Sequence, residues 1–302
     1  MGLLTRVPRG VRDRVVRTLP EWWWTWLHQL REIDVDREWM GGALLRAAYP
    51  RIAAPLSGLA ALREAEVRVH SQNGEDGILA WLVDRIGATS REVVEFGIGD
   101  GSECCAANLV LSFGWSAVLL EADPLGAASA EARFRERVGD RVVVVNTFVE
   151  PDNVNALLRE RISSVFDVLS VDVDGNDYWI LEALSAVRPR LIVIEYNASF
   201  GPDRSVTIPY TRGFDRYRIH ASGFYYGASL AALARLGERK GYILAGCDSR
   251  GVNAFLVDAE AAAAAGIEPV APGAAFAPLF ERAHLSVAEQ FEQIAHLPLI
   301  EV

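Results

Sequence analysis

Acidic and amide side chains follow two apolar runs in the second half of the chain. Residues 170–179 have the sequence SVDVDGNDYW, which places Asp172 and Asp174 after one run, and Glu195 and Asn197 lie at the end of the next. A carboxylate with a raised pKa can take a proton from a hydroxyl group, and clustered hard oxygen ligands suit Mg²⁺. The residue types therefore indicate general-base or magnesium chemistry.

These side chains meet only if their elements bring them together. If both runs are parallel strands, their carboxyl ends lie at one edge of the sheet, where open α/β sheets hold their ligands. We then expect Asp172, Glu195 and Asn197 to hold Mg²⁺, with Asp174 beside them.

Two alternatives need no metal. In the first, Asp172 acts as the general base, alone or with His220. In the second, residues 174–177 form a turn, and Asn176 or Asp177 caps the helix that follows.

A glycine-rich segment follows an earlier apolar run. Residues 92–101 have the sequence EVVEFGIGDG. Glycines let the backbone turn and pass close to a ligand, and the next helix N-terminus offers free N–H groups. We predict a cofactor loop made of Glu95, Gly97, Gly99, Gly101 and Ser102. The alternative is a tight loop without a ligand, and serine at 102 departs from the G-x-G-x-x-G spacing of nicotinamide enzymes.

The next two apolar runs also end in polar residues. The sequence AVLLEADP ends its strand at Glu121, beside Ala122, and an acid here can accept hydrogen bonds from both hydroxyls of a ribose. The third run ends in the sequence VVNTFVE, where Asn146, Thr147 or Phe148 would border an adenine. These positions predict a cofactor that contains a nucleoside.

The elements that must position these residues alternate along the chain. Apolar, β-branched runs separated by helical stretches predict a parallel sheet covered on both faces. The predicted strands are Glu92–Phe96, Ala117–Glu121, Val142–Thr147, Val168–Asp172 and Leu191–Tyr196, and the predicted helices are Cys104–Ser112, Pro124–Val138, Val154–Arg161, Tyr178–Val187 and Leu230–Lys240. After them, GYILAGC and VNAFLV flank the short polar turn at 248–251. They must form an antiparallel hairpin.

Two further motifs accompany the glycine loop and Glu121. HSQNGEDGIL lies at 70–79, and LSVDVDGNDYWILEAL at 169–184. Over residues 68–257 the chain thus resembles the FkbM-type family of S-adenosylmethionine-dependent methyltransferases, although Asp174-Gly175 replaces the usual glutamate-glycine pair of the second motif. The resemblance implies an α/β, doubly wound, mostly parallel Rossmann-like class I methyltransferase fold and S-adenosylmethionine as cofactor.

The resemblance also implies roles for the first motif. Ser71, Gln72 and Asp76 would approach the methionine end of the cofactor, while the glycine loop and Glu121 hold the rest. The structural alternative is that Ser71 or Asn73 caps the amphipathic helix that follows.

The resemblance points to a hydroxyl group of a sugar, glycan or natural product as the methyl acceptor. Catechol and metal-dependent sugar O-methyltransferases are similar in kind at the acid cluster, where the metal binds neighbouring hydroxyls and lowers the pKa of one. The alternatives are a nicotinamide-dependent oxidoreductase and a non-catalytic scaffold that binds S-adenosylmethionine.

Composition narrows the functional classes. The chain has 302 residues, is 51% hydrophobic and carries a formal charge of −10, which suits a globular enzyme and disfavours a nucleic-acid substrate. Three cysteines predict a cytoplasmic protein without disulfides. We expect neither a signal peptide nor a membrane-spanning run.

The predicted organisation has three parts. Residues 1–65 form a helical, tryptophan-rich extension, residues 66–258 the methyltransferase domain, and residues 259–302 a helical cover. The segment EWWWTW at 21–26 suggests contact with a membrane surface, but packing on the domain or on a second copy in a homo-oligomer is favoured.

Overall fold

Seven strands form the main sheet of the computed structural model, which describes residues 41–42, 58–161 and 166–302. The chain separates into two compact units, Met1–Gly41 and Gly42–Val302, and everything below concerns the second unit. The predicted helical extension and its tryptophan segment therefore lie almost entirely outside the described residues.

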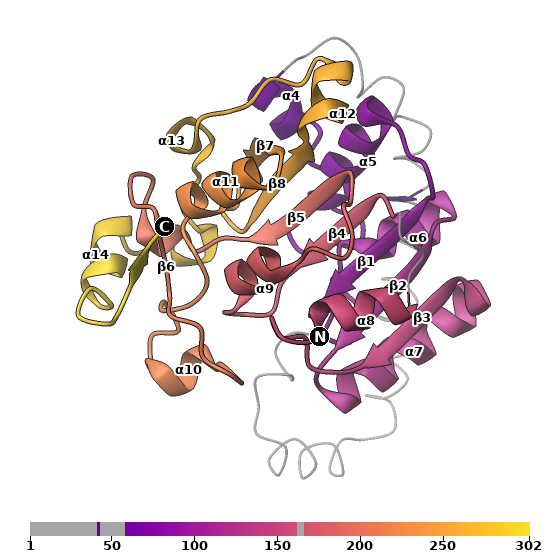
Figure 1. The fold of residues 1–302 in the computed structure, drawn as a ribbon, viewed down its shortest axis with the longest axis horizontal. Coiled ribbons are helices and arrows are strands. Elements are labelled where there is room, and N and C mark those ends of the chain that lie inside the picture. Colours follow the sequence, from indigo (N-terminus) through magenta and orange to yellow (C-terminus); the bar gives the residue numbers. More distant parts are fainter. Residues whose placement is uncertain (1–40, 43–57, 162–165) are drawn as a thin grey trace, which may run out of the picture. The chain divides into compact units, whose positions relative to one another are not determined.

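The sheet has the strand order β3-β2-β1-β4-β5-β8-β7 (Figure 1). The first five strands pair in parallel, and β8 is antiparallel to both β5 and β7. Their bounds are β1 Glu92–Phe96, β2 Ser116–Glu121, β3 Val142–Asn146, β4 Val168–Val171, β5 Leu191–Glu195, β7 Tyr242–Cys247 and β8 Asn253–Asp258. The predicted doubly wound sheet with a terminal antiparallel hairpin is confirmed.

The helices join the strands and cover the sheet. They are α4 Gly58–Glu64, α5 Glu75–Ile86, α6 Ala106–Phe113, α7 Pro124–Val138, α8 Val154–Arg161, α9 Asp177–Ala183, α10 Arg216–Ile219, α11 Leu230–Arg239, α12 Ala259–Ala265, α13 Pro272–Ala275 and α14 Val287–Glu292. Local signals set their starts: Asp123 accepts backbone N–H bonds ahead of Pro124 in α7, and Ser229 does the same for α11.

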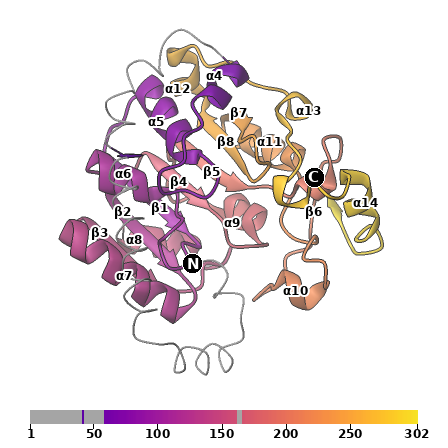
Figure 2. The ribbon, with the colours of Figure 1, turned by 180° about the vertical axis from the view of Figure 1, so that it is seen from behind.

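Alternate side chains of each strand pack into different cores. In β1, Val94 and Phe96 belong to a cluster that includes α8, α9, α11 and α13, whereas Val93 belongs to a cluster that includes α4, α5, α6, α7 and α12. Because successive side chains point to opposite faces, the two clusters are the two covered faces of the sheet (Figure 2). This explains why the strands are apolar throughout.

A smaller sheet lies at the end of the molecule away from β3 (Figure 1). Strands β6 (Val206–Thr207) and β9 (Ile300–Glu301) pair antiparallel. Around them, Phe200, Ile208 and Ile294 form the centre of a third apolar cluster. The chain between β5 and α11 thus joins the C-terminal residues in a separate layer beside the sheet edge.

The C-terminal segment has less helix than its alanine run suggests. Residues 259–302 contain three short helices, the 3₁₀ turn η3 (Phe280–Arg282) and β9. Within the described ranges, none of the helices has the length and apolar character needed to cross a membrane.

Candidate active site

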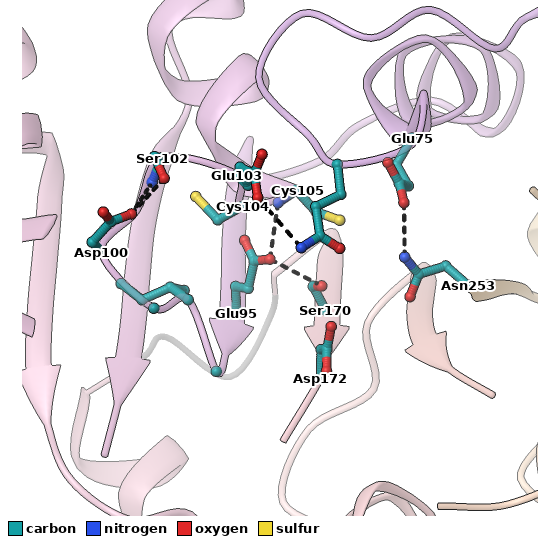
Figure 3. Close-up of a pocket in the computed structure, with 14 residues that line it drawn as sticks. Glu75, Glu95, Asp100, Ser102, Glu103, Cys104, Cys105, Ser170, Asp172 and Asn253 are labelled. Carbon is teal, nitrogen blue, oxygen red and sulfur yellow. Dashed lines mark hydrogen bonds between the residues drawn. The ribbon is translucent and has the colours of Figure 1, made fainter. Parts of the chain in front are cut away.

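A polar cavity of about 180 Å³ opens where β1 and β4 end (Figure 3). Elements far apart in the sequence meet here, because the carboxyl ends of parallel strands share one edge. The cavity is lined by Gln72, Glu75, Glu95, Gly97, Ile98, Gly99, Asp100, Ser102, Glu103, Cys104, Cys105, Ser170, Asp172 and Asn253. The predicted cofactor loop and the predicted acid after β4 therefore border the same space.

The three glycines of the loop serve different purposes. All have positive φ, at 80°, 58° and 73° for Gly97, Gly99 and Gly101. A Cβ at Gly97 would lie 1.6 Å from the carbonyl oxygen of Asp172, and one at Gly101 would lie 2.9 Å from the Phe134 ring. A Cβ at Gly99 would meet nothing within 4 Å. Packing therefore requires two of the glycines, whereas Gly99 faces open space in the cavity wall.

Glu95 connects the loop to the helix behind it. Its carboxylate accepts the backbone N–H groups of Cys105 at 2.9 Å and Ala106 at 2.7 Å, at the start of α6, and the Ser170 hydroxyl at 3.3 Å. Burial raises the pKa of Glu95 to about 7, although these hydrogen bonds oppose the shift. Glu95 thus positions the loop as well as lining the cavity.

Glu121 reaches back from the end of β2 to the glycine loop. Its two carboxylate oxygens accept the N–H of Gly99 at 2.7 Å and of Asp123 at 2.8 Å. Asn146 donates to the carbonyls of Glu121 and Ala122, and the Thr147 N–H donates to the Glu121 carbonyl. Glu121, predicted to bind the ribose, and Asn146 and Thr147, predicted to border the adenine, therefore form one network that extends from β2 and β3 to the loop.

The 70–79 motif divides into a turn and a cavity wall. Asp76 is fully buried, and its Oδ2 accepts the N–H groups of Val69, His70 and Ser71 at 2.6–2.8 Å. The Asp76 N–H in turn donates to Ser71 Oγ. Burial raises the pKa of Asp76 to about 6. Ser71 and Asp76 shape the turn, and of the predicted trio Gln72 lines the cavity.

Of the two residues suggested as the cap of the following helix, Ser71 accepts the N–H of Asp76 in the first turn of α5 at 3.1 Å, and Asn73 does not cap it. The N-cap position of α5 is Gly74, with left-handed φ and no side-chain cap hydrogen bond. Asn73 instead donates its backbone N–H to Glu75 at 2.8 Å. The polar groups at this turn therefore bond mainly to one another, and Ser71 also bonds to the first turn of α5.

Sequence reasoning missed Asn253 as part of the cavity. Asn253 Nδ2 donates to Glu75 Oε1 at 2.9 Å, and both side chains are buried. Because β8 is antiparallel, its first residue lies beside Glu195, the last residue of β5. The signal was available: Asn253 is the polar residue that begins the apolar run NAFLV.

The polar residues that follow β4 and the acid that ends β5 form two groups. Asp177 accepts the N–H groups of Val173 at 2.8 Å and Gly175 at 2.9 Å, and Asn176 donates to the Thr211 carbonyl at 2.9 Å. Asn176 occupies the N-cap position of α9 but makes no side-chain cap hydrogen bond. The alternative predicted for residues 174–177 is thus right about the turn and wrong about the side-chain cap. Asp177 holds the turn before the helix, and Asn176 bonds the turn to Thr211.

The second group forms a carboxylate cluster, by which we mean Asp172, Asp174 and Glu195. One oxygen from each lies within 4.8 Å of the others. A cation is already among them, because Arg216 Nη1 lies 2.9 Å from Asp174 Oδ1 and 4.0 Å from Glu195 Oε1. Glu195 Oε2 is buried without a hydrogen-bond partner.

Burial and mutual repulsion change the proton affinity of this cluster. Burial raises the pKa of Asp172 and of Glu195 well above the usual range, and the negative charge of the neighbouring carboxylates raises both further. The Arg216 guanidinium opposes the shift. The cluster therefore holds protons more tightly than exposed carboxylates do.

Two predicted catalytic residues serve the fold instead. Asn197 is fully buried, donates to the carbonyls of Phe224 and Tyr226 at 2.7 and 2.9 Å, and accepts the Ser199 N–H. Its amide is occupied, so we withdraw Asn197 as a magnesium ligand and as a catalytic residue. His220 follows α10 with Nδ1 2.7 Å from Ser222 Oγ and its ring against His296. His220 is neither among the residues that line the cavity nor in the carboxylate cluster, so a role as base has no support from its position.

Several solved structures resemble the chain. The mitomycin 7-O-methyltransferase MmcR has 18% identity and a TM-score of 0.36, over 60% of this chain and 55% of the other, so this chain spans about half of that enzyme. The O-methyltransferase from Bacillus cereus in complex with S-adenosylhomocysteine has 20% identity and a TM-score of 0.40, over 73% and 99%. The magnesium protoporphyrin IX methyltransferase of Synechocystis PCC 6803 has 15% identity and a TM-score of 0.40, over 74% and 96%.

A comparison with curated proteins gives no match. A match to a family model covers the sheet from its first strand to α11. Residues 84–240, just over half of the 302, match the methyltransferase FkbM domain. The chain therefore belongs to the FkbM-type family of class I S-adenosylmethionine-dependent methyltransferases.

Proposed function

We propose that the protein transfers a methyl group from S-adenosylmethionine to a hydroxyl group of a small polyhydroxylated molecule, such as a sugar, a glycan or a sugar-containing natural product. The position of Asp172 carries this proposal. Asp172 lines the cavity beside the glycine loop and also belongs to the carboxylate cluster. A methyl donor in the cavity and a hydroxyl group at the cluster would therefore meet at Asp172.

The cavity suits the charge of the methyl donor. S-adenosylmethionine carries a positive sulfonium and a positive ammonium group, and the cavity wall contains Glu75 and Glu95. We place the methionine part over Gly97–Gly101 and the ribose at Glu121. The exposed side chains of Leu125 and Phe148, beyond the ends of β2 and β3, offer apolar surfaces to the adenine.

The carboxylate cluster suits an uncharged acceptor. An anionic acceptor would be repelled by three carboxylates, whereas a hydroxyl group can donate a hydrogen bond to one of them. In the reaction, the hydroxyl oxygen attacks the methyl carbon, the bond between that carbon and sulfur breaks, and the hydroxyl proton passes to Asp172. The products are the methyl ether and S-adenosylhomocysteine.

Magnesium assistance is the alternative within this function. The cluster offers the hard oxygen donors that Mg²⁺ prefers, with Asp174 in the place predicted for Asn197. Bound there, Mg²⁺ would supply a Lewis acid that lowers the pKa of the acceptor hydroxyl. Against this alternative, Arg216 already contributes a positive charge at the same carboxylates.

Two measurements test the proposal. Calorimetric titration should show binding of S-adenosylmethionine and no binding of NAD; the reverse result would establish the oxidoreductase alternative. Transfer of a labelled methyl group should then be measured on a panel of sugars and glycosides beside amine and carboxylate acceptors. Transfer to the amines or carboxylates alone would contradict O-methylation, and binding without transfer to any acceptor would favour the scaffold.

A further inference from the structure

One arginine of helix α10 faces the carboxylate cluster. The side chain of Arg216 is 21% exposed, whereas those of Arg212 and Arg218, just before and within the same helix, are 76% and 86% exposed. Arg212 and Arg218 pair with Asp152 and Asp215 near the surface. Arg216 therefore differs from its neighbours in being directed inward, toward acids from β4 and β5.

Aromatic rings and the helix start hold this arginine in place. Its guanidinium carbon lies 4.9 Å from the ring centroid of Tyr226 and 5.2 Å from that of Tyr217. Asp215 accepts the N–H groups of Tyr217 and Arg218 and so fixes the start of α10. The position of the guanidinium is set by packing as well as by charge.

Three carboxylates so close together repel one another unless a cation or a bound proton lies among them. One oxygen from each of Asp172, Asp174 and Glu195 lies within 4.8 Å of the others, the spacing of a divalent metal site. Arg216 Nη1 contacts Asp174 and approaches Glu195 within this group. A divalent ion bound there would lie within a few ångströms of the guanidinium charge and would be repelled by it.

We propose that Arg216 is the resident cation of the carboxylate cluster, in the place that a divalent metal ion takes in metal-dependent O-methyltransferases. The guanidinium offsets the repulsion among the carboxylates and fixes Asp174 and Glu195 around the acceptor position. Arg216 is thus a positioning residue that makes a metal unnecessary. Only its part in catalysis rests on the proposed function, because the exclusion of metal is a binding property of the folded protein.

Metal binding by Arg216 variants tests this inference without any turnover. Mn²⁺ added to the full chain can be followed by electron paramagnetic resonance, since free and bound Mn²⁺ give different signals. Wild type should show no specific Mn²⁺ binding. Arg216→Gln should gain one site, which binds Mn²⁺ at least about tenfold more tightly than any residual binding by wild type. Arg216→Ala is the second variant, should the glutamine variant fail to fold.

Matched controls locate the gained site. Arg218→Gln removes an exposed arginine from the same helix and should bind no Mn²⁺. Arg216→Lys keeps the positive charge and should also bind none. Adding Asp172→Asn and Glu195→Gln to Arg216→Gln should abolish the gained site.

Specific Mn²⁺ binding by wild type, at the affinity of Arg216→Gln, would overturn the proposal. Failure of the folded Arg216→Gln and Arg216→Ala variants to gain binding would overturn it as well. Neither result depends on the acceptor or on methyl transfer. The inference and the proposed function can therefore fail separately.

Discussion

Asp172 and Asp177 are close in the sequence but have different roles. Asp177 is fully buried and accepts two backbone N–H groups of the turn before α9. Asp172 reaches the cavity and the carboxylate cluster, and its backbone carbonyl packs against Gly97. Residue type alone could not separate these roles. The hydrogen-bond partners of the two side chains distinguish these roles.

Asp172→Asn should reduce methyl transfer by at least about a hundredfold, because an amide cannot take up the acceptor proton. The affinity for S-adenosylmethionine should stay within about threefold, since the glycine loop and Glu121 would hold the donor. Single-turnover kinetics and calorimetry measure the two quantities. Wild-type rates in this variant would remove Asp172 from the mechanism.

Asp177→Asn is the comparison at the same turn. An amide can accept only one of the two N–H groups through its oxygen, so its main effect should be a loss of roughly 1–3 kcal/mol in the free energy of unfolding. Urea denaturation of both variants separates the two effects. Equal stability losses would contradict the division of roles.

Two glycines of the loop make a similar pair. Gly97→Ala should lower the free energy of unfolding by about 3 kcal/mol or more, because its Cβ would strike the carbonyl of Asp172. Gly99→Ala should cost only about 1 kcal/mol, from left-handed φ alone. Urea denaturation measures both losses of unfolding free energy. A larger loss in Gly99→Ala than in Gly97→Ala would contradict the packing of Gly97 against β4.

At the scale of elements, the site depends on contacts that join a strand to the helix that follows it and to the neighbouring strand. Glu95 of β1 holds the start of α6 and also the Ser170 hydroxyl of β4. Its pKa of about 7 lies above the ordinary value of 4.5 because the carboxylate is buried. This junction therefore links the stability of the sheet edge to pH.

The sign of that pH dependence follows from the raised pKa. The folded state holds the Glu95 proton more tightly than the unfolded chain, so the stabilisation is fully present below pH 4.5 and is lost as pH rises to about 7. The contribution is up to about 3 kcal/mol. Unfolding free energies of wild type and Glu95→Gln between pH 4.5 and 7.5 should differ in slope. Parallel curves would show that Glu95 titrates normally.

The elements could be predicted from the sequence more completely than the site. Continuous apolar strands and the short turn at 248–251 determine the sheet, because burial on both faces leaves a local pattern. The loop glycines and Glu121 were predicted from local motifs as well, namely a glycine-rich turn after one strand and an acid at the end of the next. The contacts of Arg216 and Asn197 depend on which segments fold over the sheet edge after β5. No local sequence pattern predicts that packing.

At the scale of the whole molecule, the balance of charge around the site matters more than the total of −10. Three acids from the ends of β4 and β5 converge at the sheet edge, and Arg216 from α10 places a positive charge beside them. Methyl transfer by the wild-type protein should therefore be unchanged after extensive dialysis against EDTA. Loss of activity in EDTA and its return with Mg²⁺ would restore the magnesium alternative.

The place of β8 in the sheet has a consequence for how the protein is made. β8 lies between β5 and β7, although β7 precedes it in the chain. A nascent chain that has emerged only as far as residue 250 would have β5 as an open edge, β7 without its neighbour, and Glu75 without Asn253. One late insertion closes the exposed edge and completes the cavity wall. Nascent chains that end before residue 258 should therefore be much less resistant to protease than chains that extend beyond it. Chaperones that recognise open strand edges should bind the shorter chains.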